Sequence, residues 1–255
     1  MFGRVNSVLA VIGIILAGGY GTRLYPLTKN IAKPLLKISD KPIIDYIVEK
    51  LVELDLERIL VAVNERFKDQ FAEWLRNRGY LGVELRVEPS RNEKKKLGAI
   101  KGLSRLLDEV KDDCIVVAGD NLFTSSLTGF KEFYLEKKAP VVGLYDIGDL
   151  NKVSSLSMAE IDHEGRIIRF VEKPEKPTST LVGIGAYMLP ERSLKRINEY
   201  LEEGNNPDSP GFFVQWLHRR EPVYGYVLEG YWWDIGTPEA YYEAKRFLEK
   251  AGNFV

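Results

Sequence analysis

A glycine-rich segment, residues 16–23, has the residue types and the spacing of a phosphate-binding loop, and it directly follows an apolar run. Glycines let backbone N–H groups approach a polyphosphate closely, and the planar guanidinium of an arginine can bind a phosphate through two hydrogen bonds. The segment therefore predicts a site for a polyphosphate ligand. Its candidate binding residues are Leu16, Ala17, Gly18, Gly19, Gly21, Thr22 and Arg23.

The spacing of this segment disfavours two better-known phosphate motifs. The dinucleotide-binding motif needs a third glycine three residues after the second, where this chain has Leu24. The Walker motif ends in Gly-Lys-Ser or Gly-Lys-Thr, and no such ending follows here. Hydride transfer on a Rossmann dehydrogenase and hydrolysis by a P-loop enzyme are both disfavoured for this reason.

Two aspartates lie where a divalent cation could bind, as phosphoryl and nucleotidyl transfer require. Asp120 follows an apolar run that ends at Ala118, and open α/β sheets bind their ligands at the carboxyl ends of parallel strands. Asp234 precedes a predicted helix with Pro238 in its first turn, and Thr237 is the better N-cap, which leaves Asp234 free for another role. An Asp-Asn pair after a strand also suits an ordinary turn, so the motif at Asp120 alone leaves both interpretations open.

Two lysines could supply cations to the same site. Lys33 begins a Lys-Pro-Leu-Leu motif shortly after the glycine-rich segment, and Lys173 follows Glu172 in a Glu-Lys-Pro motif at the end of a predicted strand. Positive side chains balance the charge of phosphate groups during transfer. Taken alone, however, a Glu-Lys pair at a strand end is usually a solvated surface pair.

The elements that must position these residues alternate between strand-like and helix-like segments. Short β-branched runs are typical of buried strands, and apolar residues at helical spacing indicate helices. Two closely spaced segments, 156–161 and 166–172, predict a hairpin. We therefore expect an α/β fold with a mixed, mainly parallel sheet flanked by helices. The other predicted strands are 8–16, 58–63, 83–87, 114–118 and 141–145, and the predicted helices are 43–54, 67–78, 98–110 and 127–137.

Composition narrows the function classes further. The chain has 255 residues, 45% of them hydrophobic, so it can bury an α/β core without disulfides or metals. Its 36 basic and 37 acidic residues give a net charge of −1, which disfavours nucleic acid or an anionic membrane as partners, and no apolar run reaches the length of a membrane span. The single cysteine, Cys114, is interpreted as a buried strand residue, and we expect a reducing, cytoplasmic compartment.

The order of the motifs carries a family resemblance. The glycine-rich segment is followed by Pro-Leu-Thr at 26–28, by Lys-Pro-Leu-Leu at 33–36 and by Lys-Pro-Ile-Ile-Asp-Tyr at 41–46. Residues 14–46 resemble the N-terminal signature of the sugar-1-phosphate nucleotidylyltransferases, most closely the glucose-1-phosphate thymidylyl- and uridylyltransferases. The resemblance implies a Rossmann-like fold of the nucleotide-diphospho-sugar transferase type. It also implies an enzyme that condenses glucose 1-phosphate with dTTP or UTP and releases pyrophosphate.

The resemblance implies roles for the candidate residues on the nucleotide side. It assigns Asp120 and Asp234 to a Mg²⁺ ion held between the enzyme and the nucleotide. Arg23 and Lys33 would balance the charge of the triphosphate. The catalytic residues that the resemblance implies are Arg23, Lys33, Asp120, Lys173 and Asp234.

On the acceptor side the resemblance implies that Glu172 accepts hydrogen bonds from sugar hydroxyls and that Lys173 binds the sugar phosphate. Gly185, on the following predicted strand, would let the sugar ring approach the backbone. No Pro- or Ser-rich linker divides the chain, so we expect a single domain over 1–255. Within it we expect an N-terminal extension (1–11), a nucleotide-binding half (about 12–150) and a sugar-phosphate half (about 151–255).

The N-terminal apolar segment has an alternative interpretation as a secretory signal peptide. An arginine, an apolar run and then small residues occur in residues 1–17. Cleavage there would remove part of the glycine-rich segment, so we interpret the run as a buried parallel strand.

Base recognition is where the chain departs from the enzymes it resembles. Those enzymes commonly read the pyrimidine edge with a glutamine that precedes a helix starting with glycine. Here Gly98 aligns with that glycine, which leaves Glu88 at or near the glutamine position. The polar stretch 91–96 is then an insertion, and we interpret its lysine run, 94–96, as a solvated loop. A carboxylate suits the donors of guanine or cytosine better than O4 of uracil or thymine. Exposure of Glu88 to solvent by the insertion is an equal alternative.

Other substrates and a different class of function stay open. Ser154-Ser155-Leu156-Ser157 stands where related enzymes often have Tyr-Gly near the sugar. The same chemistry on mannose 1-phosphate with GTP, or on phosphocholine with CTP, is an alternative. So is a regulatory subunit that binds a nucleotide sugar without turnover, although such a subunit should first lose the metal aspartates or the phosphate cations. The expected partners are a nucleoside triphosphate and a sugar 1-phosphate, and the sequence leaves homo-oligomer formation open.

The implied mechanism is a direct in-line displacement. A phosphate dianion is already a competent nucleophile, so no general base is needed. His163 lies in a predicted turn and His218 in a polar segment, and we expect both to be exposed.

Overall fold

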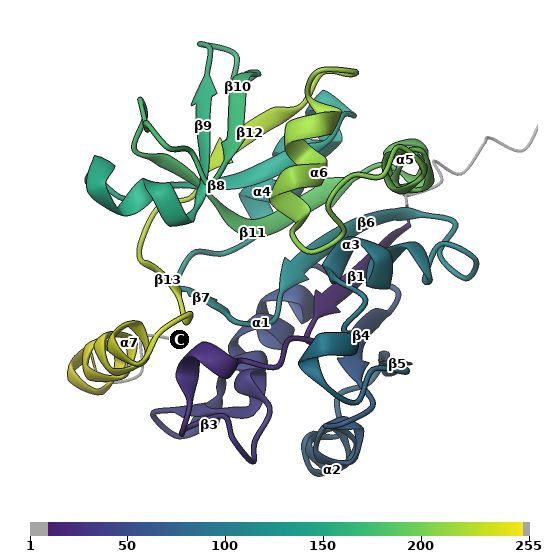
Figure 1. Cartoon of the computed structure of the whole chain (residues 1–255), viewed down its shortest axis with the longest axis vertical. Coiled ribbons are helices and arrows are strands. Elements are labelled where there is room, and N and C mark those ends of the chain that lie inside the picture. Colours follow the sequence, from purple (N-terminus) through teal and green to yellow (C-terminus); the bar gives the residue numbers. More distant parts are fainter. Residues whose placement is uncertain (1–9, 252–255) are drawn as a thin grey trace, which may run out of the picture.

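The computed structural model describes residues 10–251, in which a nine-stranded sheet carries helices on both faces (Figure 1). Seven strands follow the order β10-β9-β11-β6-β1-β4-β5, and β8 and β12 continue from β11. The strands of this sheet are β1 (Val11–Leu16), β4 (Ile59–Asn64), β5 (Val83–Glu88), β6 (Asp113–Ala118), β8 (Val141–Asp146), β9 (Ser157–Ile161), β10 (Ile167–Glu172), β11 (Leu181–Leu189) and β12 (Tyr224–Val227).

Two short ladders lie outside the main sheet, and seven α-helices occur within residues 10–251. The ladders are β2 (Lys37–Ile38) with β3 (Lys41–Pro42), and β7 (Asn121–Phe123) with β13 (Trp232–Asp234). The helices are α1 (Ile43–Val52), α2 (Lys68–Arg78), α3 (Ala99–Ser104), α4 (Thr128–Lys137), α5 (Glu191–Glu202), α6 (Pro210–Leu217) and α7 (Pro238–Ala251).

The first half of the sheet is parallel and the second half is mixed, as predicted. Strand β1 pairs in parallel with β4 and β6, and β4 pairs in parallel with β5. The predicted hairpin is confirmed as the antiparallel pair β9–β10. Strand β11 joins the halves, because it is antiparallel both to β6 and to β8. In Figure 1, β6 and β11 accordingly lie between the lower group of strands and the upper one.

Alternation along β1 divides the core between the two faces of the sheet. Val11 and Ile15 pack with α1, α2 and α4, whereas Ile12 and Ile14 pack with α3, α5 and α6. A separate apolar cluster fixes α7 and β13 against the β2–β3 hairpin. Cys114 is fully buried in β6, which confirms its interpretation as a strand residue. Across residues 10–251, none of the helices combines the length and the apolarity that a membrane crossing requires.

Two predictions about individual elements need correction. The helix predicted over 98–110 extends only from Ala99 to Ser104, because Gly102 and Ser104 are weak helix formers and the chain tightens into turns, with Leu106 N–H donating to Leu103 carbonyl at 2.9 Å. The strand predicted from residue 8 starts at Val11, and residues 8 and 9, like most of the expected extension, lie outside the described residues.

The expectation that both histidines are exposed is right for only one of them. His163 is exposed at the β9–β10 turn. His218 is half-buried, with its ring centroid 6.5 Å from that of Phe170 and its Nδ1 3.3 Å from the carbonyl oxygen of Val214. The polar neighbours of His218 in sequence concealed its position at the end of α6, on the side that packs against β10. Burial lowers the pKa of His218.

Candidate active site

The carboxyl ends of β1 and β6 lie side by side and define the edge where the site is built. Leu16 pairs with Ala118, and the N–H of Gly119 donates to the carbonyl of Leu16 at 2.9 Å. The glycine loop, as we call residues 16–23, and Asp120 therefore leave the sheet at the same edge, as predicted. A cleft of about 520 Å³ opens there.

Two buried polar side chains that the sequence analysis did not identify hold the glycine loop from behind. Nδ2 of Asn64, at the end of β4, donates to the carbonyl of Gly18 at 3.0 Å, and the Thr28 hydroxyl donates to the carbonyl of Gly21 at 2.7 Å. Both side chains are fully buried. Gly21 has a φ of +61°, a left-handed conformation that favours glycine. Arg23 lies exposed at the end of this fixed loop.

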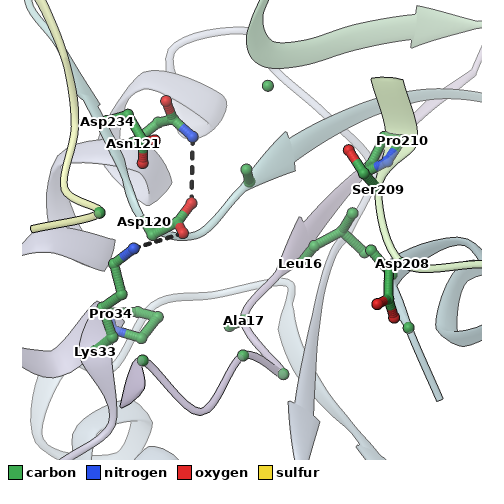
Figure 2. Close-up of a pocket in the computed structure, with 18 of the residues that line it drawn as sticks. Leu16, Ala17, Lys33, Pro34, Asp120, Asn121, Asp208, Ser209, Pro210 and Asp234 are labelled. Atoms are coloured by element: carbon green, nitrogen blue, oxygen red, sulfur yellow. Dashed lines mark hydrogen bonds and ion pairs between the residues drawn. The ribbon is translucent and has the colours of Figure 1, made fainter. Parts of the chain in front are cut away.

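An ion pair between Lys33 and Asp120 lines the cleft (Figure 2). Nζ of Lys33 is 2.7 Å from Oδ2 of Asp120, and the Lys33 side chain is 7% exposed whereas that of Asp120 is 37% exposed. Burial would raise the pKa of Asp120, but the charge and hydrogen bond of Lys33 outweigh it and hold that pKa below its ordinary value. The carboxylate is therefore ionised and still open to the cleft.

Asp234 reaches the same place from the other end of the chain. Strand β13 pairs antiparallel with β7, so Asp234 lies opposite Asn121, and the N–H of Ile235 donates to the carbonyl of Asp120 at 3.1 Å. Burial, and then the negative charge of Asp120, raise the pKa of Asp234 above its ordinary value. Two carboxylates that repel each other in this way favour a cation beside them.

The donor set around these aspartates suits a cation that also binds a ligand. Across residues 10–251 there is no cluster of three or more His, Cys, Asp or Glu side chains arranged as a metal site. Mg²⁺ characteristically takes one or two carboxylates and completes its shell with phosphate oxygens and water. The N-cap prediction is confirmed, since Oγ1 of Thr237 accepts from the N–H of Ala240 at 3.3 Å, and Asp234 is not needed there.

The side chain of Glu88, at the end of β5, faces the glycine loop. A Cβ added to Gly18 would lie 3.5 Å from the carboxylate carbon of Glu88. Ser90 donates from Oγ to Oε1 of Glu88 at 2.5 Å, and the Tyr20 hydroxyl donates to Ser90 at 3.1 Å. These hydrogen bonds hold the carboxylate at the cleft, which also contains Gly98, so the alternative that the insertion exposes Glu88 to solvent is contradicted.

The interpretation of the lysine run as a solvated loop is confirmed, since all three lysines are exposed, but one of them also has a partner in the cleft wall. The first two lysines of 94–96 are exposed and lie away from the cleft lining. Lys96 lines the cleft, with its Nζ 3.3 Å from Oδ2 of Asp208, and Glu93 accepts a hydrogen bond from the Thr22 hydroxyl at 3.1 Å. The insertion is therefore part of the cleft wall, which its charge pattern alone did not indicate.

Glu172, at the end of β10, is 8% exposed and is held by serines. Oε2 accepts a hydrogen bond from Ser157, and Oε1 accepts one from Ser209 at 2.9 Å. Gly211 packs so closely that a Cβ there would be 1.9 Å from Oε2. We call Ser157, Glu172, Ser209 and Gly211 the Glu172 floor. Part of the acceptor capacity of Glu172 is thus already used by the protein, which the sequence did not predict.

Lys173, directly after Glu172, and Gly185, on β11, both line the cleft and have left-handed backbones. Lys173 has a φ of +52°, which is uncommon for a residue with a side chain, and its N–H donates to the carbonyl of Leu156 at 2.8 Å. Its side chain is exposed and lines the cleft. Gly185 has a φ of +71°, and a Cβ there would lie 2.9 Å from that of Ala118. Packing of β11 on β6 therefore already requires this glycine.

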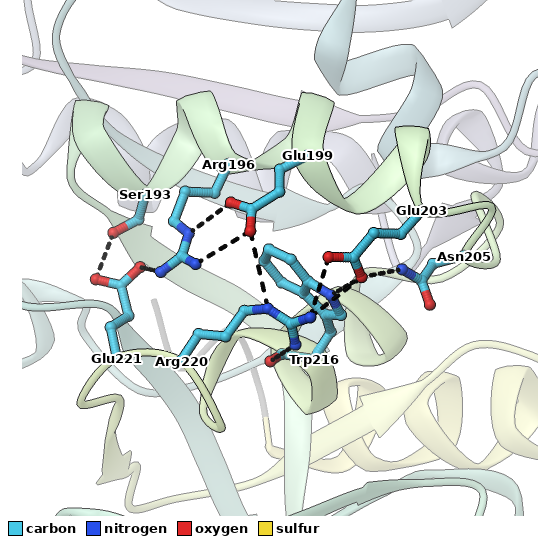
Figure 3. A network of polar contacts seen from close by, with 8 residues as sticks. All are labelled: Ser193, Arg196, Glu199, Glu203, Asn205, Trp216, Arg220 and Glu221. Carbon is cyan, nitrogen blue, oxygen red and sulfur yellow. Dashed lines mark hydrogen bonds and ion pairs between the residues drawn. The ribbon is translucent and has the colours of Figure 1, made fainter.

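A polar network anchors α6 against α5 (Figure 3), and the N-terminal end of α6 places Ser209 and Pro210 in the cleft lining. The guanidinium of Arg220 lies 4.0 Å from the ring centroid of Trp216 and pairs with Glu203 at 3.0 Å. Nε1 of Trp216 donates to Glu203 at 2.6 Å. Cation–π contacts and hydrogen bonds of this kind fix the position of the helix on which the Glu172 floor depends.

The structure brings every candidate residue into this cleft. The predicted residues that line it are Leu16, Ala17, Gly18, Gly19, Gly21, Thr22, Arg23, Lys33, Glu88, Gly98, Asp120, Glu172, Lys173, Gly185 and Asp234. The lining residues that the prediction missed include Glu93, Lys96, Asn121, Ser157, Tyr187, Asp208, Ser209, Pro210 and Trp232. A serine followed by proline at 209–210 did signal a helix start, but nothing in the sequence linked that start to Glu172.

Comparison with known proteins gives consistent matches. The family model described as nucleotidyl transferase matches residues 12–251. The glucose-1-phosphate thymidylyltransferase of Xanthomonas campestris pv. campestris (strain B100) is 31% identical over 93% of this chain and 80% of that protein. The bifunctional protein GlmU of Methanocaldococcus jannaschii is 28% identical over 92% of this chain and 53% of that protein. A structure described as a glucose-1-phosphate thymidylyltransferase from Bacillus anthracis in complex with a sucrose has a TM-score of 0.83 and 27% identity, covering 93% of this chain and 95% of that one.

The relatives differ in length, and those named as glucose-1-phosphate nucleotidylyltransferases differ in the nucleotide. This chain spans 53% to 62% of the length of two methanogen GlmU proteins and two glucose-1-phosphate adenylyltransferases. A UTP–glucose-1-phosphate uridylyltransferase from Haloferax volcanii also matches, at 26% identity. The names of the thymidylyl-, adenylyl- and uridylyltransferases therefore agree on nucleotidyl transfer and differ in the nucleotide.

Proposed function

This chain belongs to the nucleotidyl transferase family, and from that premise we propose that it condenses a sugar 1-phosphate with a nucleoside triphosphate to give a nucleotide sugar and pyrophosphate. The observation that carries the proposal is the single cleft lined by the glycine loop, the Lys33–Asp120 pair, Asp234 and Glu172–Lys173. Binding without turnover, as in a regulatory subunit, would not require two adjacent carboxylates and several cations. Their presence in one cleft favours an enzyme.

Glucose 1-phosphate with dTTP or UTP is the proposed substrate pair. It is supported by the names of the thymidylyl- and uridylyltransferases that this chain resembles at 31% and 26% identity. The position of Glu88 favours GTP as a second candidate. A carboxylate accepts hydrogen bonds from N1–H and N2–H of guanine, whereas O4 of uracil or thymine would face its negative charge.

In the proposed reaction an oxygen of the sugar phosphate attacks the α-phosphorus in line with the leaving pyrophosphate. One P–O bond forms, and the bond from the α-phosphorus to the oxygen that bridges to the β-phosphorus breaks. The nucleophile is a phosphate dianion, so no proton has to be removed and no covalent enzyme intermediate forms. Neither His163 nor His218 lines the cleft, which agrees with this mechanism.

The side chains of the cleft would bind and orient the two substrates. Arg23, exposed at the end of the glycine loop, would bind triphosphate oxygens together with the backbone N–H groups of that loop. The ammonium group of Lys33, which pairs with Asp120, would also interact with the triphosphate. Lys173 would bind the sugar phosphate and hold the attacking oxygen in place.

Asp120 and Asp234 would hold a divalent cation, Mg²⁺. Burial and the neighbouring Asp120 raise the pKa of Asp234, which a cation would relieve, and phosphate oxygens would complete a shell that the protein leaves open. Bound there, the ion would neutralise charge on the phosphate oxygens.

The experiment that tests the function is a pyrophosphate-release screen. Four ribonucleoside triphosphates and dTTP are each combined with glucose, mannose and N-acetylglucosamine 1-phosphates and with phosphocholine, in MgCl₂. We expect turnover to be fastest with glucose 1-phosphate and either UTP or dTTP. Fastest turnover with GTP would select the second candidate, and no pyrophosphate from any pair would overturn the proposal.

A further inference from the structure

A line of contacts runs from the glycine loop across the insertion towards the Glu172 floor. At its start the Thr22 hydroxyl donates to Glu93 at 3.1 Å, over a sequence separation of 71 residues. Three residues later Lys96 pairs with Asp208 at 3.3 Å, and both side chains are about half exposed, at 44% and 49%. The insertion thus contacts the glycine loop at one end and a segment from the second half of the chain at the other.

That segment, residues 207–211, is called the bridge segment below. At the start of α3, the N–H of Ile100 donates to the carbonyl of Pro207 at 2.9 Å, and the N–H of Ala99 donates to the carbonyl of Asp208 at 3.4 Å. The contact with Gly98 is closer still, because a Cβ there would be 2.5 Å from the first of these carbonyl oxygens. The bridge segment therefore rests directly on the backbone beside the candidate base site.

The other end of the bridge segment belongs to the Glu172 floor. Ser209 donates to Oε1 of Glu172 at 2.9 Å, and Gly211 packs on the same carboxylate. Figure 2 shows Asp208, Ser209 and Pro210 following one another along the wall of the cleft. Asp208 and Ser209 are adjacent in the chain, so a displacement of the insertion that moves Asp208 also moves the hydroxyl that holds Glu172.

We propose that the bridge segment makes the binding of the nucleoside triphosphate and of the sugar 1-phosphate mutually favourable, with Lys96, Asp208 and Ser209 as positioning residues. The inference rests on the proposed function. A triphosphate on the glycine loop holds the insertion, the Lys96–Asp208 pair holds the bridge segment, and Ser209 then holds Glu172 ready for the sugar. Linkage requires the reverse effect to be equally large.

The test measures binding without turnover. The probes are α,β-methylene UTP, in which a CH₂ group replaces the leaving bridging oxygen, and glucose 1-phosphate, both in MgCl₂. The dissociation constant of the analogue is measured by calorimetry with and without saturating glucose 1-phosphate, and the ratio is the coupling factor. We expect a factor of about five or more in the wild type.

Two variants should lower this factor selectively. Lys96→Glu should lower the coupling factor by about two- to fivefold, as expected for loss of an exposed ion pair. The double variant Lys96→Glu/Asp208→Lys, which exchanges the two charges, should restore the coupling factor. Ser209→Ala should lower it while the affinity for the analogue alone changes by less than about twofold. The matched control is Lys195→Glu, which breaks an exposed pair with Glu191 on α5 and should leave the factor unchanged.

The outcomes separate the inference from the function on which it rests. A wild-type factor of one, or a factor that Lys96→Glu and Ser209→Ala leave unchanged, overturns the coupling alone. Failure of the wild type to bind either probe, together with no turnover in the pyrophosphate screen, overturns the proposed function and the coupling with it. A merely structural role of Lys96 would weaken both binding constants and leave their ratio as it was.

Discussion

Asp120 and Glu172 are two carboxylates of one cleft, and the protein stabilises their charges in different ways. Asp120 pairs with Lys33 through Oδ2, accepts a hydrogen bond from Nδ2 of Asn121 on Oδ1 at 3.2 Å, and remains 37% exposed at the cleft. Glu172 is buried, has no ion-pair partner among residues 10–251, and is held by two neutral hydroxyls. A carboxylate paired with a cation can exchange part of that pairing for a ligand. A carboxylate held by hydroxyls from separate elements instead organises those elements, so we infer a chemical role for Asp120 and an organising one for Glu172.

The largest expected effect follows from the chemical role on the Asp120 side. Asp120→Asn and Asp234→Asn should each lower kcat by about a hundredfold to a thousandfold, because each removes charge stabilisation that acts on the reacting phosphates. In the proposed mechanism the two aspartates hold one ion and act as a unit, so the double variant should be little worse than either single one. The measurement is steady-state pyrophosphate release, with circular dichroism to verify the fold and exposed Asp108→Asn as the control. Full activity in excess chelator would contradict the assignment.

The next effect tests whether the two sides bind different substrates. Arg23→Ala should cost about 2–4 kcal/mol of transition-state stabilisation, calculated from the loss of kcat/KM for the triphosphate. Lys173→Ala should mainly lower kcat/KM for the sugar 1-phosphate. Varying one substrate at a time, with the other saturating, separates the two effects. If Lys173→Ala raised only the apparent KM of the triphosphate, its placement on the sugar side would be wrong.

A pair of glycine substitutions sharpens the comparison sterically. Gly211→Ala places a Cβ 1.9 Å from Glu172 Oε2 and Gly98→Ala places one 2.5 Å from the Pro207 carbonyl oxygen, so each should lower the free energy of unfolding by about 1–3 kcal/mol. Gly211→Ala should impair sugar 1-phosphate use more than triphosphate use, and Gly98→Ala should do the opposite. Urea unfolding and the two specificity constants measure these effects. The same pattern in both variants would show that the sides are not separate.

A smaller effect is expected at the base. Glu88→Gln replaces an anionic acceptor with an amide that also donates, so preference should shift towards UTP and dTTP by about 1–3 kcal/mol. The ratios of specificity constants for all nucleoside triphosphates report the shift. Ser104→Ala, on the nearby α3 with its side chain bonded only to its own helix, is the control. Unchanged ratios in Glu88→Gln would remove Glu88 from base recognition.

The smallest effect concerns stability on the Glu172 side. Burial lowers the pKa of His218 in the folded chain, so the unfolded chain binds more protons once the pH falls below the unfolded value, near 6.5. The contribution of His218 to the free energy of unfolding should therefore fall by under about 1 kcal/mol between pH 7.5 and pH 5.5, so His218→Gln should lose less stability than the wild type over this range. The exposed His163→Gln is the control, and urea unfolding at both pH values gives the numbers. A pH dependence identical in wild type and His218→Gln would contradict the prediction.

The parts of the site that could be predicted from the sequence are those in which one strand and the loop after it supply the residues. The apolar run before Gly18 and the run that ends at Ala118 each carried a strand signal, and parallel pairing placed their ends together. The pattern of β9 and β10 likewise predicted the hairpin that ends at Glu172. These features depend on local periodicity and on one topological rule, which is why they could be predicted.

The contacts that escaped prediction are those between side chains far apart in sequence. Ser209 lies 37 residues from Glu172, and Lys96 lies more than 100 residues from Asp208. Neither a serine nor an exposed lysine carries a local signal for its partner. The burial of His218 was missed for the same reason, since Phe170 on β10 covers it and the sequence around His218 is polar.

The position of β11 bears on how the cleft responds to heat. This strand pairs with β6, which ends at Asp120, and with β8 and β9 of the second half. Adjacent strands lie about 4.8 Å apart, a spacing fixed by their ladder hydrogen bonds. The strand ends that carry Asp120 and Glu172 are therefore parts of one hydrogen-bonded sheet. Warming should therefore raise the rate smoothly, and inactivation should coincide with melting of the whole sheet rather than precede it.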